Sequence, residues 1–261
     1  MSCLKRKRVI ATAIQYLYIL RNDGWRIAET FYWPSLGITV WGYVSTWTNQ
    51  GTGGLFNFLG PIILWEATAQ GIIAIAINMI DELNASSIVS LFSTPLSIRE
   101  WALASVPTSL LTSCLVATYC SLLAWLLFGY NPLSMGWPLL PIAINLFGFG
   151  VAIGLACTAL LLRVGLRIKS LMYMLSWCLF PLAGAFYPVD MLPQWLQAIT
   201  HCLPLCHLFD IVRAQNMAMY IAIYKLGVAT ALTTLYLAFS FCLLAYAFRK
   251  TLNHGLARLT Y

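Results

Sequence analysis

The sequence has 261 residues, of which 61% are hydrophobic and only 9% are charged. Soluble domains carry about 25% charged residues, so this composition excludes a sizeable water-soluble enzyme domain. The apolar runs are long and continuous instead of alternating over segments of about 10 residues, which excludes a transmembrane β-barrel. We therefore expect an all-α integral membrane protein that forms a single domain over residues 1–261.

The net charge of +7 comes from short basic clusters beside the apolar runs. This distribution indicates membrane topology, and we expect no binding to nucleic acid. Thirteen of the fifteen lysines and arginines fall on the side of the chain termini, and only Arg213 and Lys225 fall on the other side. The positive-inside rule then places both termini in the cytoplasm and the chain, as a multi-pass protein, in the plasma (inner) membrane.

The N-terminal segment begins with the basic cluster Lys5–Arg8 and continues as an apolar run to Leu20. This run of roughly 12 residues is too short to cross a bilayer, which needs about 20. It also lacks the small-residue cleavage site that would follow the core of a signal peptide. We predict an interfacial amphipathic helix on the cytoplasmic face.

Six later apolar runs are long enough, or nearly so, to cross the membrane as helices. The predicted spans are residues 29–47, 60–80, 101–128, 138–162, 170–187 and 226–248. Gly148, Gly150 and Gly154 in the fourth span favour close packing against another helix.

The first two spans contain the residues that we select as candidates for a substrate pathway. The first span is rich in aromatic side chains, and Trp33 and Trp41 lie on one helix face because they are eight residues apart. Such aromatics stack on sugar rings or apolar ligands, although they are more often interface anchors. The second span carries Glu66, and carboxylates inside a membrane are costly and often functional. The candidates are Trp33, Trp41, Tyr43 and Glu66.

Two connecting stretches differ from ordinary loops. Residues 81–100 lie on the cytoplasmic side and combine two acids, a short helical pattern, a Thr94-Pro95 turn and an Arg99-Glu100 pair. Residues 188–215, on the opposite side, contain three prolines that break or start helices, and charged residues that are costly in hydrocarbon. We predict two short half-helices between spans five and six.

Motifs for chemistry within the chain are missing. The sequence contains no GxxxxGK[ST] loop for ATP, and no HExxH or GxSxG motif. The nearest approach to a metal site is His201, Cys202, Cys206, His207 and Asp210, whose spacing matches no zinc signature. His201 and His207 are six residues apart, and they lie on different helix faces unless Pro204 bends the chain. We therefore predict no catalytic residue, no metal site and no cofactor in this chain.

Two segments resemble type-2 ABC exporter permeases, the membrane subunits of ATP-driven transporters. The first is STPLSIREW at residues 93–101, which is similar to the end of their cytoplasmic loop. The second is residues 186–213, which resembles the motif between their fifth and sixth spans. It contains Tyr187-Pro188, Leu192-Pro193, Trp195-Leu196, Pro204-Leu205 and the pair Asp210 and Arg213.

The resemblance implies a six-span subunit that pairs with a second copy or a paralogue and docks a separate ATPase, which binds ATP and Mg. The docking surface would be the loop at 81–100, helped by the N-terminal helix, and the half-helices would form an outer re-entrant gate. The coupling residues implied are Asp81, Glu82, Ser87, Phe92, Pro95, Arg99 and Glu100. The outer-gate residues implied are Tyr187, Pro188, Trp195, Asp210 and Arg213.

These expectations leave several functions open. The first is export of an amphipathic or lipid-linked substrate, with a glycan-type molecule as the first choice because of the aromatics in span one. The alternatives are export of lipophilic drugs, a haem-related export, and a membrane-embedded protein that handles metal or haem through His201 and His207. A passive scaffold, which would bind no ATPase, is a further class.

Overall fold

The computed structural model describes residues 2–47, 51–84, 96–185, 187, 189–213 and 218–254, and within these residues it contains helices and no strand. The helices are α1 (Ser2–Asn22), α2 (Gly24–Trp47), α3 (Gly51–Asn84), α5 (Ile98–Phe128), α6 (Leu139–Val164), α7 (Lys169–Leu182), α8 (Gln194–His201), α9 (Pro204–Arg213) and α10 (Met219–His254). Short 3-10 turns occur at η1 (Pro132–Met135), η2 (Leu166–Ile168) and η3 (Val189–Met191). The expected all-α class is thereby confirmed for the described residues.

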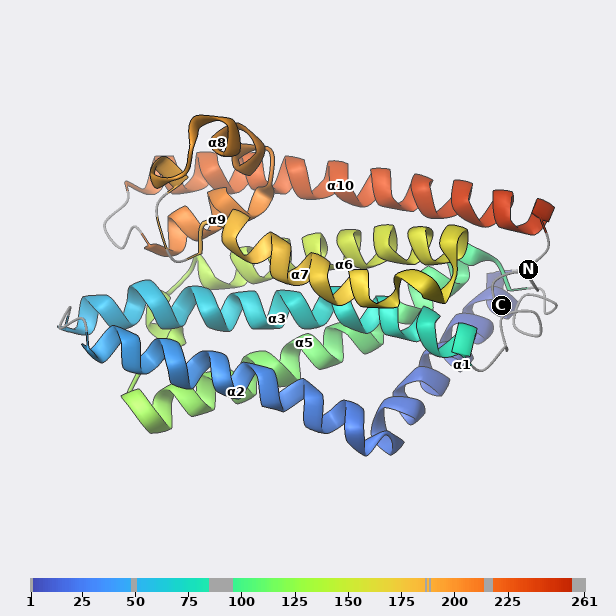
Figure 1. Cartoon of the computed structure of the whole chain (residues 1–261), viewed down its shortest axis with the longest axis horizontal. Helices are drawn as coiled ribbons and strands as arrows, with labels where there is room; N and C mark the ends of the chain where they lie inside the picture. The colour runs from blue at the N-terminus through green and yellow to red at the C-terminus, as the bar shows by residue number, and fades with distance from the viewer. Residues whose placement is uncertain are drawn as a thin grey trace.

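The long helices run along the longest axis of the molecule, and α1 crosses one end at an angle (Figure 1). The start of α1 and the end of α10 lie at this same end, whereas α8 and α9 lie at the opposite one (Figure 1). We call these the terminal end and the outer end. The arrangement separates the two connecting stretches that the sequence singles out.

Four helical segments of the described chain have the length and apolar composition to cross a membrane. They are Phe58–Asn84, Ile98–Phe128, Leu139–Val164 and Met219–Leu252. The predicted first and fifth spans correspond to α2 and α7, which are not among these four. With 14 residues, α7 is only about 21 Å long at 1.5 Å per residue, short of the roughly 30 Å of a hydrocarbon core.

The helices of the structure differ in extent from the predicted spans and loops at several places. Helix α3 continues through Asn84 and α5 begins at Ile98, so the connection predicted over 81–100 is shorter at both ends. Helix α7 ends at Leu182 instead of 187, because Pro181 stands in its last turn and Gly184 follows with a φ of +63°. Residues 85–95 lie outside the described residues.

The predicted pair of short helices between spans five and six is present as α8 and α9. Pro193 occupies the N-cap of α8, and Pro204 is the first residue of α9. Proline is favourable at a helix start because its fixed φ suits the helix and the first N–H groups have no partner there. The positions of these two prolines therefore set where each of the two short helices begins.

Helix α3 is the centre of the bundle, with α2, α5 and α6 packed around it. In the span-length window of α3, 72% of residues are buried, against 22% in α10. The main chains of α3 and α6 lie close together at two glycines of α6. A Cβ added to Gly150 would lie 3.0 Å from a main-chain carbonyl oxygen of α3, and a Cβ added to Gly154 would lie 2.9 Å from another. The predicted role of these glycines in helix packing is confirmed.

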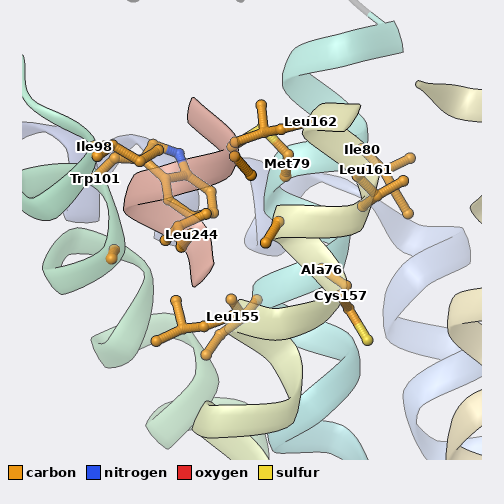
Figure 2. Packing of buried hydrophobic residues seen from close by; sticks show 14 of the residues in the cluster. Ala76, Met79, Ile80, Ile98, Trp101, Leu155, Cys157, Leu161, Leu162 and Leu244 are labelled. Carbon is orange, nitrogen blue, oxygen red and sulfur yellow. The ribbon is translucent and has the colours of Figure 1, made fainter. Parts of the chain in front are cut away.

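The core at the terminal end joins residues of six helices, α1, α3, α5, α6, α7 and α10, around Trp101, which is fully buried. Figure 2 shows this indole of α5 beside Leu244 of α10, with Met79 of α3 and Leu162 of α6 nearby. Close van der Waals packing of such side chains helps to hold the bundle together, because lipid tails are as apolar as leucine and leaving lipid brings little hydrophobic gain.

Candidate functional site

A cavity of about 330 Å³ lies between α2, α3 and α7. Each helix contributes residues spaced three or four apart, which is one helix face, so three faces converge on the space. Aromatic side chains make up much of the wall: Trp33 and Trp41 from α2, Trp65 from α3, and Trp177 and Phe180 from α7.

Glu66 provides a carboxylate in this largely apolar cavity. The side chain is half-buried, and it makes no hydrogen bond or ion pair with another residue in the described part of the chain. Its carboxylate faces α2 at Gly37, where a Cβ would lie 3.1 Å from Oε1 of Glu66. A charged or polar ligand group in the cavity would therefore find an uncommitted acceptor.

Of the four pathway candidates, the structure brings three together in this cavity: Trp33, Trp41 and Glu66. Tyr43 does not line it. Its side chain is 61% exposed and packs edge-on against Phe128 of α5. Sequence reasoning missed Trp65 and Trp177, which face the same space from α3 and α7. Helical spacing shows which residues share a face of α3 or α7, but it does not show that these faces turn toward α2.

A polar network closes the terminal end of this region. Arg26 of α2 is buried and donates to Asp81 of α3 over 3.1 Å and to Asn78 over 3.3 Å. Asn78 in turn donates to Thr108 of α5 over 3.2 Å, so one chain of contacts joins three helices. Asp23 accepts from the main-chain N–H of Arg26 and caps the start of α2.

Most charged residues of the predicted coupling stretch are engaged inside the protein. Asp81 pairs with Arg26, and buried Glu82 accepts a hydrogen bond from Tyr16 of α1 over 3.2 Å. Glu100 is buried and forms a reciprocal capping box with Ser97 at the start of α5. Of the described coupling residues, only Arg99 is exposed. Ser87, Phe92 and Pro95 lie outside the described residues.

The predicted outer-gate residues take different positions. Asp210 and Arg213 of α9 pair over 2.6 Å, and Lys225 of α10 joins them with a 2.8 Å contact to Asp210. Trp195 of α8 is 68% exposed. The hydroxyl of Tyr187 donates to the carbonyl of Pro181. Pro188 lies outside the described residues.

His201 and His207 lie close to each other, although a spacing of six residues would place them on different faces of a continuous helix. Helix α8 ends at His201 and α9 starts at Pro204, so the chain turns between them. Candidate ligand atoms of His201, Cys206 and His207 all lie within 4.8 Å of one another. None of these three residues lines the cavity between α2, α3 and α7.

Comparison with known families gives one match, to the family described as ABC-2 type transporter, over residues 9–217. The matched region includes α1 from residue 9 onward, the whole cavity and both short helices of the outer end. A search of curated proteins found no matching relative.

Proposed function

The chain belongs to the ABC-2 type transporter family, and we propose that it is the membrane subunit of an ATP-driven exporter for an amphipathic substrate. A separate ATPase subunit supplies the energy, because the chain itself has no phosphate-binding loop. Transport by this family's membrane subunits does not require catalysis within the chain. ATP and Mg are therefore assigned to the partner.

The observation that carries the proposal is the cavity between α2, α3 and α7. Ligand pockets of roughly 300–1,000 Å³ with apolar walls and a few polar groups are typical of small-molecule sites. This one has about 330 Å³, six aromatic side chains in its wall and the uncommitted carboxylate of Glu66. Apolar walls accept a lipid-like portion, while Glu66 and neighbouring polar groups accept hydroxyl donors.

A lipid-linked glycan fits this chemistry because aromatic faces stack on sugar rings and a carboxylate accepts their hydroxyl groups. A lipophilic cationic drug is the second candidate, since tryptophan faces and a carboxylate also attract a cation. The haem-related alternative has less support, because the two histidines that motivated it lie outside the cavity.

In the proposed arrangement α2 is a further span, α7 completes the sixth together with the preceding turn η2 because α7 alone is shorter than the hydrocarbon core, and α8 and α9 form a re-entrant gate over the outer end. Helix α2 is 24 residues long, about 36 Å, which is enough to cross the hydrocarbon core. The broken helices after α7 suit a position beside protein or water, where free main-chain groups are tolerated. The ATPase docks at the terminal end, where Arg99 is exposed, and a second copy or paralogue completes the transporter.

The test uses the chain copurified with its ATPase in mild detergent and reconstituted in proteoliposomes. The probe is a short-chain lipid with a labelled sugar headgroup, and the measurement is its ATP-dependent translocation. We expect Glu66→Gln and Trp41→Ala to reduce the rate about 10-fold, equivalent to about 1.4 kcal/mol of lost interaction. Tyr43→Ala, outside the cavity on the same helix, is the matched control and should keep the rate.

The outcomes separate the alternatives. If a lipophilic cationic dye is translocated with the same dependence on Glu66 and Trp41, and the glycolipid is not, the drug-type substrate replaces the glycan. If no ATPase copurifies, the transport proposal fails and a scaffold is favoured. Equal rates for Trp41→Ala and Tyr43→Ala would remove the cavity from the pathway.

A further inference from the structure

The break between α8 and α9 places three metal-ligand side chains side by side. Main-chain hydrogen bonds from Cys202 to Ile199 and from Leu203 to Thr200 close the last turn of α8. Pro204 is then the first residue of α9. His201 at the end of one helix therefore meets Cys206 and His207 in the first turn of the next.

We propose that His201, Cys206 and His207 form a binding site for a zinc-class divalent cation. The ligand atoms lie within 4.8 Å of one another, and Nδ1 of His201 is 4.0 Å from Sγ of Cys206. Zinc bonds of about 2.0–2.3 Å place neighbouring ligand atoms roughly 3.5 Å apart, so small side-chain rotations close the three ligands around an ion.

The residue types favour zinc over a hard cation. Imidazole nitrogen and thiolate sulfur are the ligands that zinc prefers, while magnesium and calcium take oxygen ligands. The full chain has three histidines, and two of them are in this cluster. Exposed His201 gives an ion access from the aqueous side, and buried Cys206 forms the floor of the site.

The surroundings also suit a bound ion. Nε2 of His207 lies 3.1 Å from the main-chain carbonyl of His201, and contacts of this kind orient the rings of metal-ligating histidines. The Cys206 thiol donates to the carbonyl of Leu203 over 3.4 Å, and ion binding replaces this proton, which is released to solvent. The resulting thiolate is bonded to the cation, and no oxidation is involved.

The nearest carboxylate on α9, Asp210, is already paired with Arg213 and Lys225. It is therefore not available as a fourth ligand, and the site has three protein ligands with one position for water. Because the ligands come from both short helices, the ion fixes α8 to α9. This site is independent of the cavity and of ATP-driven transport.

Cobalt(II) is the probe, because thiolate ligation gives it a charge-transfer absorption that zinc lacks. The full chain is purified in detergent with an affinity tag that contains no histidine, stripped with a chelator and titrated with Co²⁺. We expect one Co²⁺ per chain, a thiolate-to-cobalt band, and loss of the spectrum when Zn²⁺ is added.

Cys206→Ser should abolish the charge-transfer band. His201→Ala should weaken cobalt binding by about 100-fold or more. Removal of a residue that only supports a metal ligand costs about 10–100-fold in metal affinity, and loss of a ligand should cost at least the upper end of that range. His201 is exposed, so this second variant leaves the packing intact if Cys206→Ser folds poorly. Cys202→Ser and His254→Ala are the matched controls and should bind cobalt like the wild type.

Two results would overturn the site. One is a wild-type protein that shows no thiolate band with one equivalent of Co²⁺. The other is a band that persists unchanged in Cys206→Ser and His201→Ala. Neither result depends on an ATPase or on transport, so failure here is distinguishable from failure of the exporter proposal.

Discussion

The described charged residues of the predicted coupling stretch divide into three carboxylates with partners inside the protein, Asp81, Glu82 and Glu100, and the exposed Arg99. Glu82 accepts from Tyr16, and the same Tyr16 oxygen accepts from the indole N–H of Trp101 over 2.6 Å. Burial, and then the charge of Glu82, raise the pKa of Tyr16, so its hydroxyl keeps the proton that it donates. Tyr16 thereby ties α1 to α3 and α5.

We predict that Tyr16→Phe destabilises the protein by about 1–3 kcal/mol, because the indole N–H of Trp101 and the carboxylate of Glu82 both lose a buried partner. Thermal unfolding of the purified protein in detergent measures the change. Tyr18→Phe is the control, since Tyr18 is two residues away on α1 and 66% exposed, against 1% for Tyr16. Equal melting temperatures of the two variants would contradict the role of this contact.

At the scale of elements, the contact between α6 and α3 determines the position of the cavity wall. Gly154 allows the two main chains to approach, since its Cβ position lies 2.9 Å from the carbonyl oxygen of Ile72. That oxygen belongs to a helix and cannot move away as a flexible side chain can. Displacement of α3 would also move Trp65 and Glu66, which line the cavity.

We predict that Gly154→Ala destabilises the bundle by about 1–3 kcal/mol, the usual cost of overpacking. Gly227→Ala on α10 is the matched control, because nothing lies within 4 Å of its Cβ position. That control should be neutral or stabilising by up to about 1 kcal/mol, as alanine favours helix over glycine. The free energy of unfolding of both variants is measured from unfolding curves in the same detergent. Equal stability of Gly154→Ala and Gly227→Ala would refute the close contact.

The whole molecule has two chemically different ends. The start of α1 and the end of α10 lie at the terminal end with Arg99, and the outer end contains α8, α9 and exposed Trp195 (Figure 1). In the topology that we propose from the positive-inside rule, the terminal end faces the cytoplasm. The ATPase and the proposed cation would then meet the protein on opposite sides of the membrane.

Orientation is testable with single cysteines in a variant from which the native cysteines have been removed. We predict that Trp195→Cys reacts with a membrane-impermeant maleimide in intact cells, because the residue is exposed at the outer end. Arg99→Cys should react only after the membrane is permeabilised, which also controls for its accessibility. Labelling of Arg99→Cys in intact cells would reverse the proposed topology.

Several features of the fold were predictable from sequence because they depend on local chemistry. Apolar runs indicated the helical membrane class, and the positions of Pro193 and Pro204 indicated the two short helices that now appear as α8 and α9. Helix bounds were less predictable. The last turn of α3 is charged and polar in sequence, yet it remains helical because Arg26 and Tyr16, distant along the chain, satisfy Asp81 and Glu82.

The candidate site shows the same limit. Sequence spacing placed Trp33 and Trp41 on one face of a helix, but it could not show that Trp65 and Trp177 of other helices face them. Likewise, Asp210 and Arg213 are near in sequence, while Lys225 reaches them from α10. Contacts between helices depend on how faces pack, and a residue pattern within one helix does not specify its neighbours.

The sequence by itself determined the class of protein, the division of the outer stretch into two short helices and the lack of an ATP-binding loop, because composition, proline and motif are properties of the local chain. Only the tertiary structure decided which carboxylates are free for a ligand or partner. Glu82 and Glu100 are engaged inside the protein while Glu66 is uncommitted. It also decided that His201, Cys206 and His207 meet. The physical reason is that partners far apart in the chain are brought together by helix packing and turns, which no local pattern encodes.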